Sequence, residues 1–346
     1  MRQFTDDKEI EIVKSNLSQC QSLLTFLGSD WVERELLQKK ERSRAHFLFW
    51  LLFDKAKSAK LQSWLEVLND KFPKTKFFGT LNKLRKYREE TDFYSLLPEI
   101  EVASFYASKG KIDYHPPHAD LRFIVDGHEV WFEIAKLFSS KQEKHLKSLS
   151  DLVRSRLDNI SGNKYVISFR ISPDFNKSDV DPFVQYVSSI IAKNTISTQH
   201  VEFLFEGGKA SVTLYSKKER GHVALSRFEM PIYTAGRLKE KMLSKAQKLP
   251  ENRFNVLVFD IGLFGARPDH AESAFLGQVV PAICTNRQTG ENWTQNVRLE
   301  NGLIHKEEGK KVSALIYYED FNYENRKLIP NPMANYPISS EIQSEI

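Results

Sequence analysis

The sequence predicts a protein of the α/β class, in which a mixed central sheet is flanked by helices and preceded by a helical region. From Asp7 to about Thr91 glycine is nearly absent and apolar residues recur at helical spacing. After Pro98, apolar runs of strand length alternate with helical stretches, as they do in mixed α/β folds. With 346 residues, 41% apolar and 27% charged, the chain can bury a sizeable core.

The first region, residues 1–95, is expected to be helical. Gly28-Ser29-Asp30 offers a break followed by a helix N-cap, and Phe72-Pro73 ends a later helix. The apolar run from Phe47 to Phe53 is far shorter than the roughly 20 residues that cross a bilayer. It therefore predicts a buried helix, and no membrane contact is expected.

The second region, residues 96–275, is expected to form the α/β core. Gly110 is placed to end a helix, and Asp126-Gly127 is a strong hairpin-turn signal. The expected helices are Glu99–Ser108, Lys141–Ile160, Val180–Lys193 and Arg237–Lys248, and the expected strands are Lys111–His115, Ala119–Val125, Glu129–Ala135, Lys164–Ile171, Val201–Phe205, Ser211–Tyr215 and Asn255–Ile261. Residues 276–346 are expected to add strands and a tail packed on the core, with the polar part from about Asn322 wrapping the surface or fraying.

Charge and cysteine content limit the partner and the compartment. The net charge of +5 permits a phosphate-bearing partner without requiring one. Cys20 and Cys284 are too few for a disulfide framework and lack the clustered spacing of a zinc site, which favours a reducing, cytoplasmic environment. The acids among the first seven residues are unlike a signal peptide, so we expect a mature N-terminus.

One succession of expected elements carries chemistry: a helix with a glutamate, a strand, a strand with an aspartate, a strand with a glutamate, and a helix. Its residues are Pro98-Glu99-Ile100-Glu101-Val102-Ala103, Asp120-Leu121 and Trp131-Phe132-Glu133-Ile134-Ala135-Lys136-Leu137. This pattern resembles the core of the PD-(D/E)XK nuclease superfamily, over roughly Pro98 to Leu263. The resemblance implies a restriction-endonuclease-like fold and a divalent-metal site.

The metal ligands implied by this resemblance are Asp120 and Glu133. Hydrolysis of a phosphodiester requires an activated water and a stabilised leaving oxygen, and one or two Mg²⁺ or Mn²⁺ ions can supply both. Hard cations take oxygen ligands, and facing residues of a hairpin lie about 5 Å apart, so the two acids could share an ion. Glu99 resembles the assisting glutamate of the family's first helix; Glu101 would point to a different helix face.

The lysine of the family's motif is missing from its usual position. That position, two residues beyond the acid, is Ala135 here, and Lys136 would reach the acids only through a bulge or at the strand's end. A substitute could come from the later helix, where Arg237, Lys241 and Lys245 recur four apart and share one face. Lys136 is thus one candidate catalytic lysine, and the helix residues are candidates for catalysis or for nucleic-acid contact.

Structural readings compete with each of these assignments. Asp120 could cap a turn after Pro116-Pro117, and Glu133 could pair with Arg122 across the hairpin. Lys136 could be a strand-end surface lysine. A cluster of basic residues near the end of the helical region forms either a solvated face or a phosphate-facing surface: Lys83, Arg85, Lys86 and Arg88.

Other chemistries find little support. His115 and His118 have no third ligand at the spacing of a transition-metal site, so we expect no such site there. Asp260 ends a core strand, where it could be functional or a cap. Phosphate-binding glycine loops, GxSxG elbows and HExxH helices are absent from the sequence.

Three hypotheses follow. The first is a metal-dependent nuclease that has DNA as its expected substrate and Mg²⁺ or Mn²⁺ as its cofactor. The second is a catalytically inactive nuclease-like fold that binds nucleic acid or a protein partner, where the partner can be a second copy of the chain. The displaced lysine favours this second hypothesis. The third is an unrelated α/β protein in which the motif match is accidental.

Overall fold

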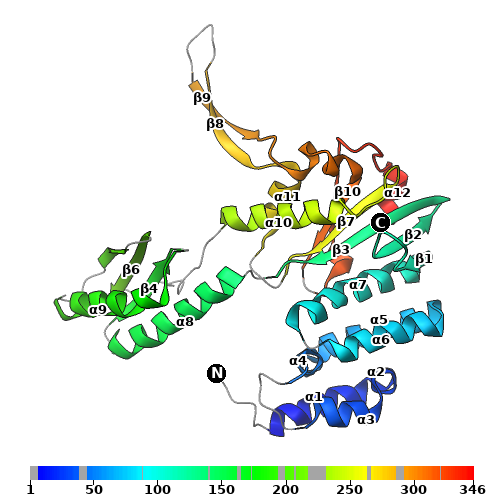
Figure 1. Cartoon of the computed structure of the whole chain (residues 1–346), viewed down its shortest axis with the longest axis horizontal. Helices are drawn as coiled ribbons and strands as arrows, with labels where there is room; N and C mark the ends of the chain where they lie inside the picture. Colours follow the sequence, from blue (N-terminus) through cyan, green and yellow to red (C-terminus); the bar gives the residue numbers. More distant parts are fainter. Residues whose placement is uncertain are drawn as a thin grey trace. The chain divides into compact units, whose positions relative to one another are not determined.

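The computed structural model describes residues 7–38, 45–87, 89–138, 141–161, 165–172, 174–193, 199–205, 208–216, 231–262, 266–285, 292–319 and 321–346 (Figure 1). The chain divides into two compact units. Unit 1 comprises residues 1–138 and 232–346, and unit 2 comprises residues 139–231. The expected α/β core of residues 96–275 is therefore shared between both units, and its two boundaries fall within helices of unit 1.

Unit 1 begins with the helical region that the sequence predicts. Its elements are α1 (Asp7–Gln19), α2 (Gln21–Leu27), α3 (Ser29–Trp31), the π-helical turn η1 (Val32–Leu36), α4 (Phe47–Phe53), α5 (Lys55–Lys71) and α6 (Lys74–Lys86). Gly28, at φ 80°, separates α2 from α3, because glycine adopts this left-handed conformation at little cost. Phe72 and Pro73 separate α5 from α6, as expected.

Helix α7 (Glu90–Lys109) is longer than the sequence predicts, because it passes through Pro98. A proline inside a helix removes one backbone donor, and packing can outweigh this loss. Phe93, Leu96 and Leu97 before the proline and Ile100 and Val102 after it are all buried in one core. Gly110 follows the helix, and its N–H donates to the Tyr106 carbonyl.

The sheet of unit 1 is mixed and has six strands in the order β1-β2-β3-β7-β10-β11. The strands are β1 (Lys111–Tyr114), β2 (Leu121–Val125), β3 (His128–Lys136), β7 (Phe254–Asp260), β10 (Ala314–Tyr318) and β11 (Lys327–Pro330). Strand β7 is parallel to both β3 and β10, and the other pairings are antiparallel. Because β7 has a partner on each side, its run of buried apolar residues is that of a central strand.

The β2–β3 hairpin has the turn that its sequence predicts. Asp126 and Gly127 have φ values of 48° and 78°, the signs that a two-residue turn of the favoured hairpin type requires. The resulting register pairs Leu121 with Phe132, so Asp120 comes opposite Glu133 at the end of the ladder.

Helices cover both faces of this sheet (Figure 1). Phe132 and Ile134 of β3 pack in the same core as α7 and the N-terminal helices. Ala135 and Leu137, on the opposite face of β3, pack with Leu238 and Met242 of α10 (Pro231–Ala246). Strand alternation therefore directs Glu133 to the α10 face and Lys136 to the α7 face.

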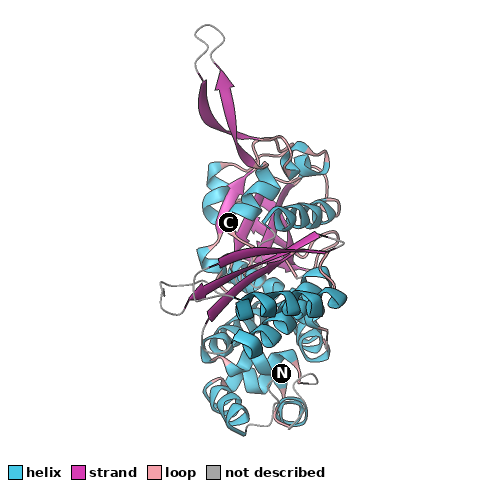
Figure 2. Ribbon diagram, turned by 90° about the vertical axis from the view of Figure 1, so that its left-hand side faces the viewer, coloured by secondary structure: helices cyan, strands magenta, loops and turns pink. Residues whose placement is uncertain are grey.

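The C-terminal part contributes to the core more than its polar sequence predicts. Strand β11 pairs with β10 at the sheet edge, and the Tyr106 hydroxyl donates to the Ile346 carbonyl. Between α11 (Pro268–Leu276) and β10, the strands β8 (Val279–Thr285) and β9 (Asn292–Arg298) form a ribbon that projects from its unit (Figure 2). Helix α12 (Ser340–Glu345) and 3-10 turns complete the segment: η4 (Leu303–His305), η5 (Glu308–Lys311) and η6 (Tyr323–Asn325).

Unit 2 has a separate core. Its antiparallel sheet has the order β4-β6-β5, and its strands are β4 (Tyr165–Ile171), β5 (Gln199–Phe205) and β6 (Gly208–Ser216). Two helices pack with this sheet, α8 (Lys141–Ser161) and α9 (Lys177–Lys193). Gly207, expected in the hairpin turn, lies outside the described residues. Among the described residues of either unit, no helix is long and apolar enough to span a membrane.

Candidate metal centre

Asp120 is fixed at the point where the chain enters β2. Its backbone N–H donates to the Phe132 carbonyl at 3.0 Å, and its own carbonyl accepts from the His115 N–H at 2.9 Å. The side-chain Oδ2 accepts a further hydrogen bond from the Ile134 N–H at 2.8 Å. Backbone contacts with the neighbouring strand thus orient this carboxylate at the open end of the hairpin.

Glu133 lies opposite Asp120, and one lysine joins the two acids. The Lys245 ammonium of α10 is 3.2 Å from Asp120 Oδ2 and 2.7 Å from Glu133 Oε2. Only 5% of the Glu133 side chain and 16% of the Lys245 side chain are exposed, so water screens this contact less than it would a surface pair. Asp120 at the entry to β2, Glu133 of β3 and Lys245 of a helix distant in sequence are thus brought together.

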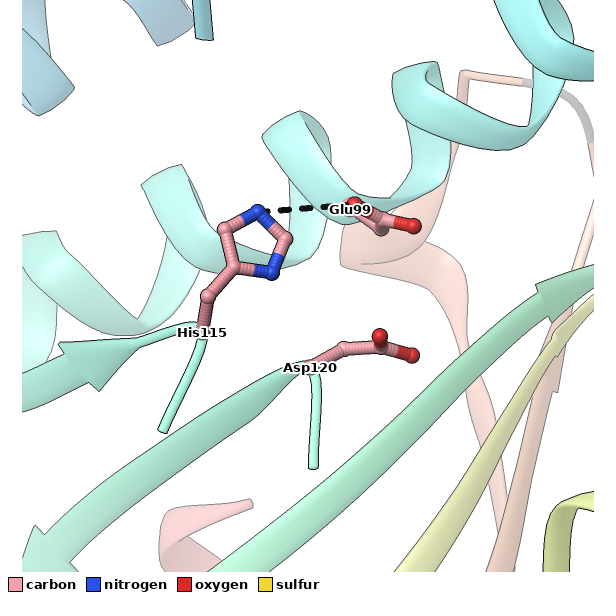
Figure 3. Close-up of side chains that lie close together, drawn as sticks. All are labelled: Glu99, His115 and Asp120. Carbon is pink, nitrogen blue, oxygen red and sulfur yellow. Dashed lines mark ion pairs between the residues drawn. The ribbon is translucent and has the colours of Figure 1, made fainter. Parts of the chain in front are cut away.

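Glu99 and His115 stand on the other side of Asp120. One ligand atom from each of Glu99, His115 and Asp120 lies within 4.8 Å of the others, and their side chains face a common space (Figure 3). The His115 Nε2 is 3.8 Å from Glu99 Oε2. His115 follows β1 with a φ of 55°, and the loop through Pro116-Pro117 returns the chain to Asp120.

The comparisons with known proteins add no relative. No family model, no curated protein and no solved structure matches the chain. The case for the site therefore rests on its geometry and its chemistry.

The acids repel one another at this site. Burial and the nearby Asp120 charge raise the pKa of Glu99 to about 8, although Lys83 and Lys245 oppose this rise. Burial and Asp120 also raise the pKa of Glu133. Burial opposes the charged form of Lys245, but the Asp120 and Glu133 charges outweigh it and raise the lysine's pKa. Such crowding of carboxylates is what a bound cation would relieve.

The donor set fits a divalent cation. Two carboxylates and an imidazole whose ligand atoms lie within 4.8 Å of one another can act as ligands for Mn²⁺ and related ions, and carboxylates alone suit Mg²⁺. Burial and the Lys83 charge lower the pKa of His115, which favours the neutral imidazole that coordinates metals. Glu133 is not one of these three residues, but it lies next to them because the Lys245 ammonium contacts both Glu133 and Asp120.

Lys136 is directed elsewhere. Its ammonium lies 2.5 Å from Asp260 Oδ2 at the end of β7, and both side chains are nearly inaccessible to solvent. It also approaches the Tyr94 and Phe321 rings on the α7 face of the sheet. The regular pairing of β3 up to Lys136 shows no bulge that would turn this lysine toward Glu133. The structure thus brings Lys245, and not Lys136, to the two acids.

The remaining candidates occupy separate positions. Glu101 accepts from the Tyr323 N–H at 3.1 Å, away from the Glu99 cluster. Arg122 pairs with Glu129 at 2.8 Å, and Glu133 pairs with Lys245 and not, as the structural reading of the hairpin predicts, with Arg122. Arg237 donates to the Phe138 carbonyl. Desolvation and the charges of Lys245 and Lys248 lower the pKa of Lys241, while Glu133 opposes this.

The sequence alone does not place His115 beside Glu99 and Asp120. Ligand spacing along the chain does not reveal this cluster, because Glu99 comes from a helix and Asp120 from the entry to the next strand. One signal was available: His115 stands directly before Pro116-Pro117 and five residues before Asp120, so a tight loop could return Asp120 to its side.

Proposed function

We propose that this chain is a metal-dependent phosphodiester hydrolase, a nuclease of the PD-(D/E)XK type with a restriction-endonuclease-like fold, and that DNA is its substrate. The observation that carries the proposal is the Lys245 ammonium, which contacts both Asp120 and Glu133. It fills the role that Ala135 leaves open in the motif. The cytoplasmic location expected from the sequence is part of the same proposal.

Each residue of the site has a role in this proposal. Asp120, Glu99 and His115 would hold Mg²⁺ or Mn²⁺, with Glu133 as the adjoining acid. When bound, the cation would make a water more acidic and would compensate the charge on the leaving oxygen. In the reaction the water releases one proton to solvent as its oxygen bonds to phosphorus, the bond to the leaving strand breaks, and the leaving oxygen takes up a proton from solvent, so that one water is consumed. Lys245 donates a hydrogen bond that orients the water between Asp120 and Glu133.

Two features extend the proposal to nucleic-acid binding. Lys241 and Lys245 share one face of α10, one turn apart, so the helix can offer a second ammonium to a neighbouring phosphate. Lys83 of α6 adds a further cation, 3.5 Å from His115 Nε2.

The test is cleavage of plasmid and linear DNA with Mg²⁺, with Mn²⁺ and with a chelator. We expect cleavage that needs the cation and that falls by about 10²-fold or more in Asp120→Asn, Glu133→Ala and Lys245→Met. Lys239→Met is the matched control, because Lys239 is on the same helix but donates to the Asn301 carbonyl. Cleavage that survives Glu133→Ala would remove the assignment.

A second function has one observation in its favour. Lys245 can itself compensate part of the charge of Asp120 and Glu133, as a structural ion triad in an inactive nuclease-like fold that binds nucleic acid or a protein. This alternative predicts DNA binding that weakens steeply with salt, without divalent-cation affinity at Asp120. Calorimetric titration with Mn²⁺ separates the two functions.

A further inference from the structure

The basic residues at the end of α6 have different surroundings. The Arg85 guanidinium donates to the Phe26 carbonyl, which ties α6 to α2. Lys86 is exposed to solvent, and Arg88 lies outside the described residues. Lys83 is half-buried and reaches His115 Nε2 at 3.5 Å. Of the described members of this cluster, Lys83 is therefore the one beside the candidate metal centre.

A cavity of about 310 Å³ lies between α6, α7 and the acids. Lys83 of α6 and Tyr87, the residue that follows α6, line it on one side, and Ser95 and Leu96 line it from α7. Glu99, His115 and Asp120 close it at the candidate metal centre. Pockets for small ligands typically measure roughly 300–1,000 Å³, so this cavity has the size for one small group and not for a base pair of a duplex.

The lining combines the groups that hold a single nucleotide. An ammonium binds a phosphate as a point charge, and an aromatic ring offers a stacking face to a base. Leu96 adds an apolar surface, and the Ser95 hydroxyl and the exposed Asp92 carboxylate can accept hydrogen bonds from a sugar or from a base amino group. Asp92 would repel a phosphate, so the phosphate belongs beside Lys83, where the ammonium and a cation held at Asp120 would offset the negative charges.

We propose that Lys83 and Tyr87 form a subsite for the nucleotide next to the phosphate that is cut, and that this nucleotide enters unpaired. The inference rests on the proposed hydrolase and assigns it a substrate class: single strands, or duplexes with a frayed or overhanging end. A base that stacks on Tyr87 must leave the stack of its own strand, which costs least where it is unpaired.

The test measures binding without cleavage. A labelled single strand and the blunt duplex of the same sequence are titrated with the full chain in Ca²⁺, and the strands are checked for integrity afterwards. We expect Tyr87→Leu to weaken single-strand binding by roughly 5- to 150-fold, Tyr87→Phe to leave it nearly unchanged, and the duplex to be affected less. Lys83→Met should reduce the slope of log affinity against log salt by about 0.7 for the single strand.

Lys86→Met is the matched control, because Lys86 is in the same turn but exposed, and it should reproduce the wild type. Thermal melting shows whether each variant is folded. Tyr87→Phe removes the hydroxyl and keeps the ring, so it separates stacking on the ring from hydrogen bonding by the hydroxyl. Equal losses for duplex and single strand in Tyr87→Leu would overturn the unpaired preference. Wild-type binding in both Lys83→Met and Tyr87→Leu would overturn the subsite.

The two proposals fail in different ways. If the wild type cuts DNA and neither substitution changes strand binding, the hydrolase stands and the subsite is refuted. If both substitutions weaken strand binding while no cation supports cleavage, a nucleotide subsite stands and the hydrolase is refuted.

Discussion

Lys245 is the residue on which the two acids of the site depend. Its ammonium is shared by Asp120 and Glu133, and its removal would leave two partly buried carboxylates facing each other. We expect Lys245→Met to lower the free energy of unfolding by about 2–3 kcal/mol in the absence of divalent cations. The measurement is urea unfolding in a chelator.

The same variant reports on the cation. Mn²⁺ would replace the missing positive charge, so it should raise the melting temperature of Lys245→Met at least as much as that of the wild type. Asp120→Asn should show little rise. If Mn²⁺ leaves all three melting temperatures unchanged, the acids do not hold a cation.

Lys136 and Asp260 form a buried pair on the other face of β3, and we predict a structural role for it. Removing one partner leaves a buried charge, so Lys136→Met should cost about 3–5 kcal/mol of stability. The double variant Lys136→Met/Asp260→Leu should recover much of this loss. Both effects are read from urea unfolding, and Mn²⁺ affinity should be retained in the double variant. Loss of Mn²⁺ binding in a folded double variant would contradict this purely structural role and would show that the pair contributes to the cation site.

At the residue scale, the sequence alone could place the two acids but not the lysine. Asp120 and Glu133 are close in sequence and joined by a predictable turn, so the hairpin register brings them together. Lys245 lies on a helix that follows unit 2, and four-residue spacing identifies its helix face without identifying what that face contacts. The local sequence pattern therefore gives Lys136, Lys241 and Lys245 as candidates for the lysine beside the acids. Tertiary packing places Lys245 there.

At the element scale, α11 depends on a histidine cap. The His270 Nδ1 accepts from the Arg267 N–H at 3.2 Å, and burial lowers the pKa of His270. A lowered pKa means that the neutral form is favoured on folding, so this stabilisation is present above pH 6.5 and is lost as the pH falls through the folded-state pKa. We expect a loss of about 0.5–2 kcal/mol as the cap breaks.

His270→Gln tests this dependence, since glutamine at the same position of a capping box can accept the bond without titrating. Unfolding free energies between pH 7 and pH 5 should fall less in the variant than in the wild type. The interpretation fails if the two proteins lose stability equally over this range.

Elements with strong local signals could be predicted, and those decided by packing could not. Asp126-Gly127 requires a hairpin and forms one. Helix α7 continues through Pro98 because buried residues on both sides of it share one core. Strand β11 has only four residues, ends in a proline and lies between polar stretches, so its pairing with the edge of β10 is not revealed by a local pattern.

At the scale of the whole molecule, every residue of the candidate site lies in unit 1. Glu99, His115, Asp120 and Glu133 precede unit 2, and Lys245 follows it. The Phe138 carbonyl accepts a bond from Arg237, so the chain leaves and re-enters unit 1 at nearby points. The sequence could not reveal this division, because the strands and helices of unit 2 have the same alternation as those of a continuous core.

We predict that unit 1 keeps the site without unit 2. Replacement of residues 139–231 by a Gly/Ser linker of about eight residues, which spans up to roughly 27 Å, should give a chain that unfolds cooperatively and binds Mn²⁺ as the full chain does. Circular dichroism and calorimetry measure these two properties. Loss of Mn²⁺ binding in a folded deletion variant would show that the site needs unit 2.

The central claim is a divalent-cation site at Asp120, and calorimetric titration of the full chain with Mn²⁺ tests it most directly. We expect one cation per chain, weaker binding in His115→Ala, loss of binding in Asp120→Asn, and unchanged binding in the Lys239→Met control. Absence of binding in the wild type, or equal binding in the wild type and Asp120→Asn, would contradict the claim.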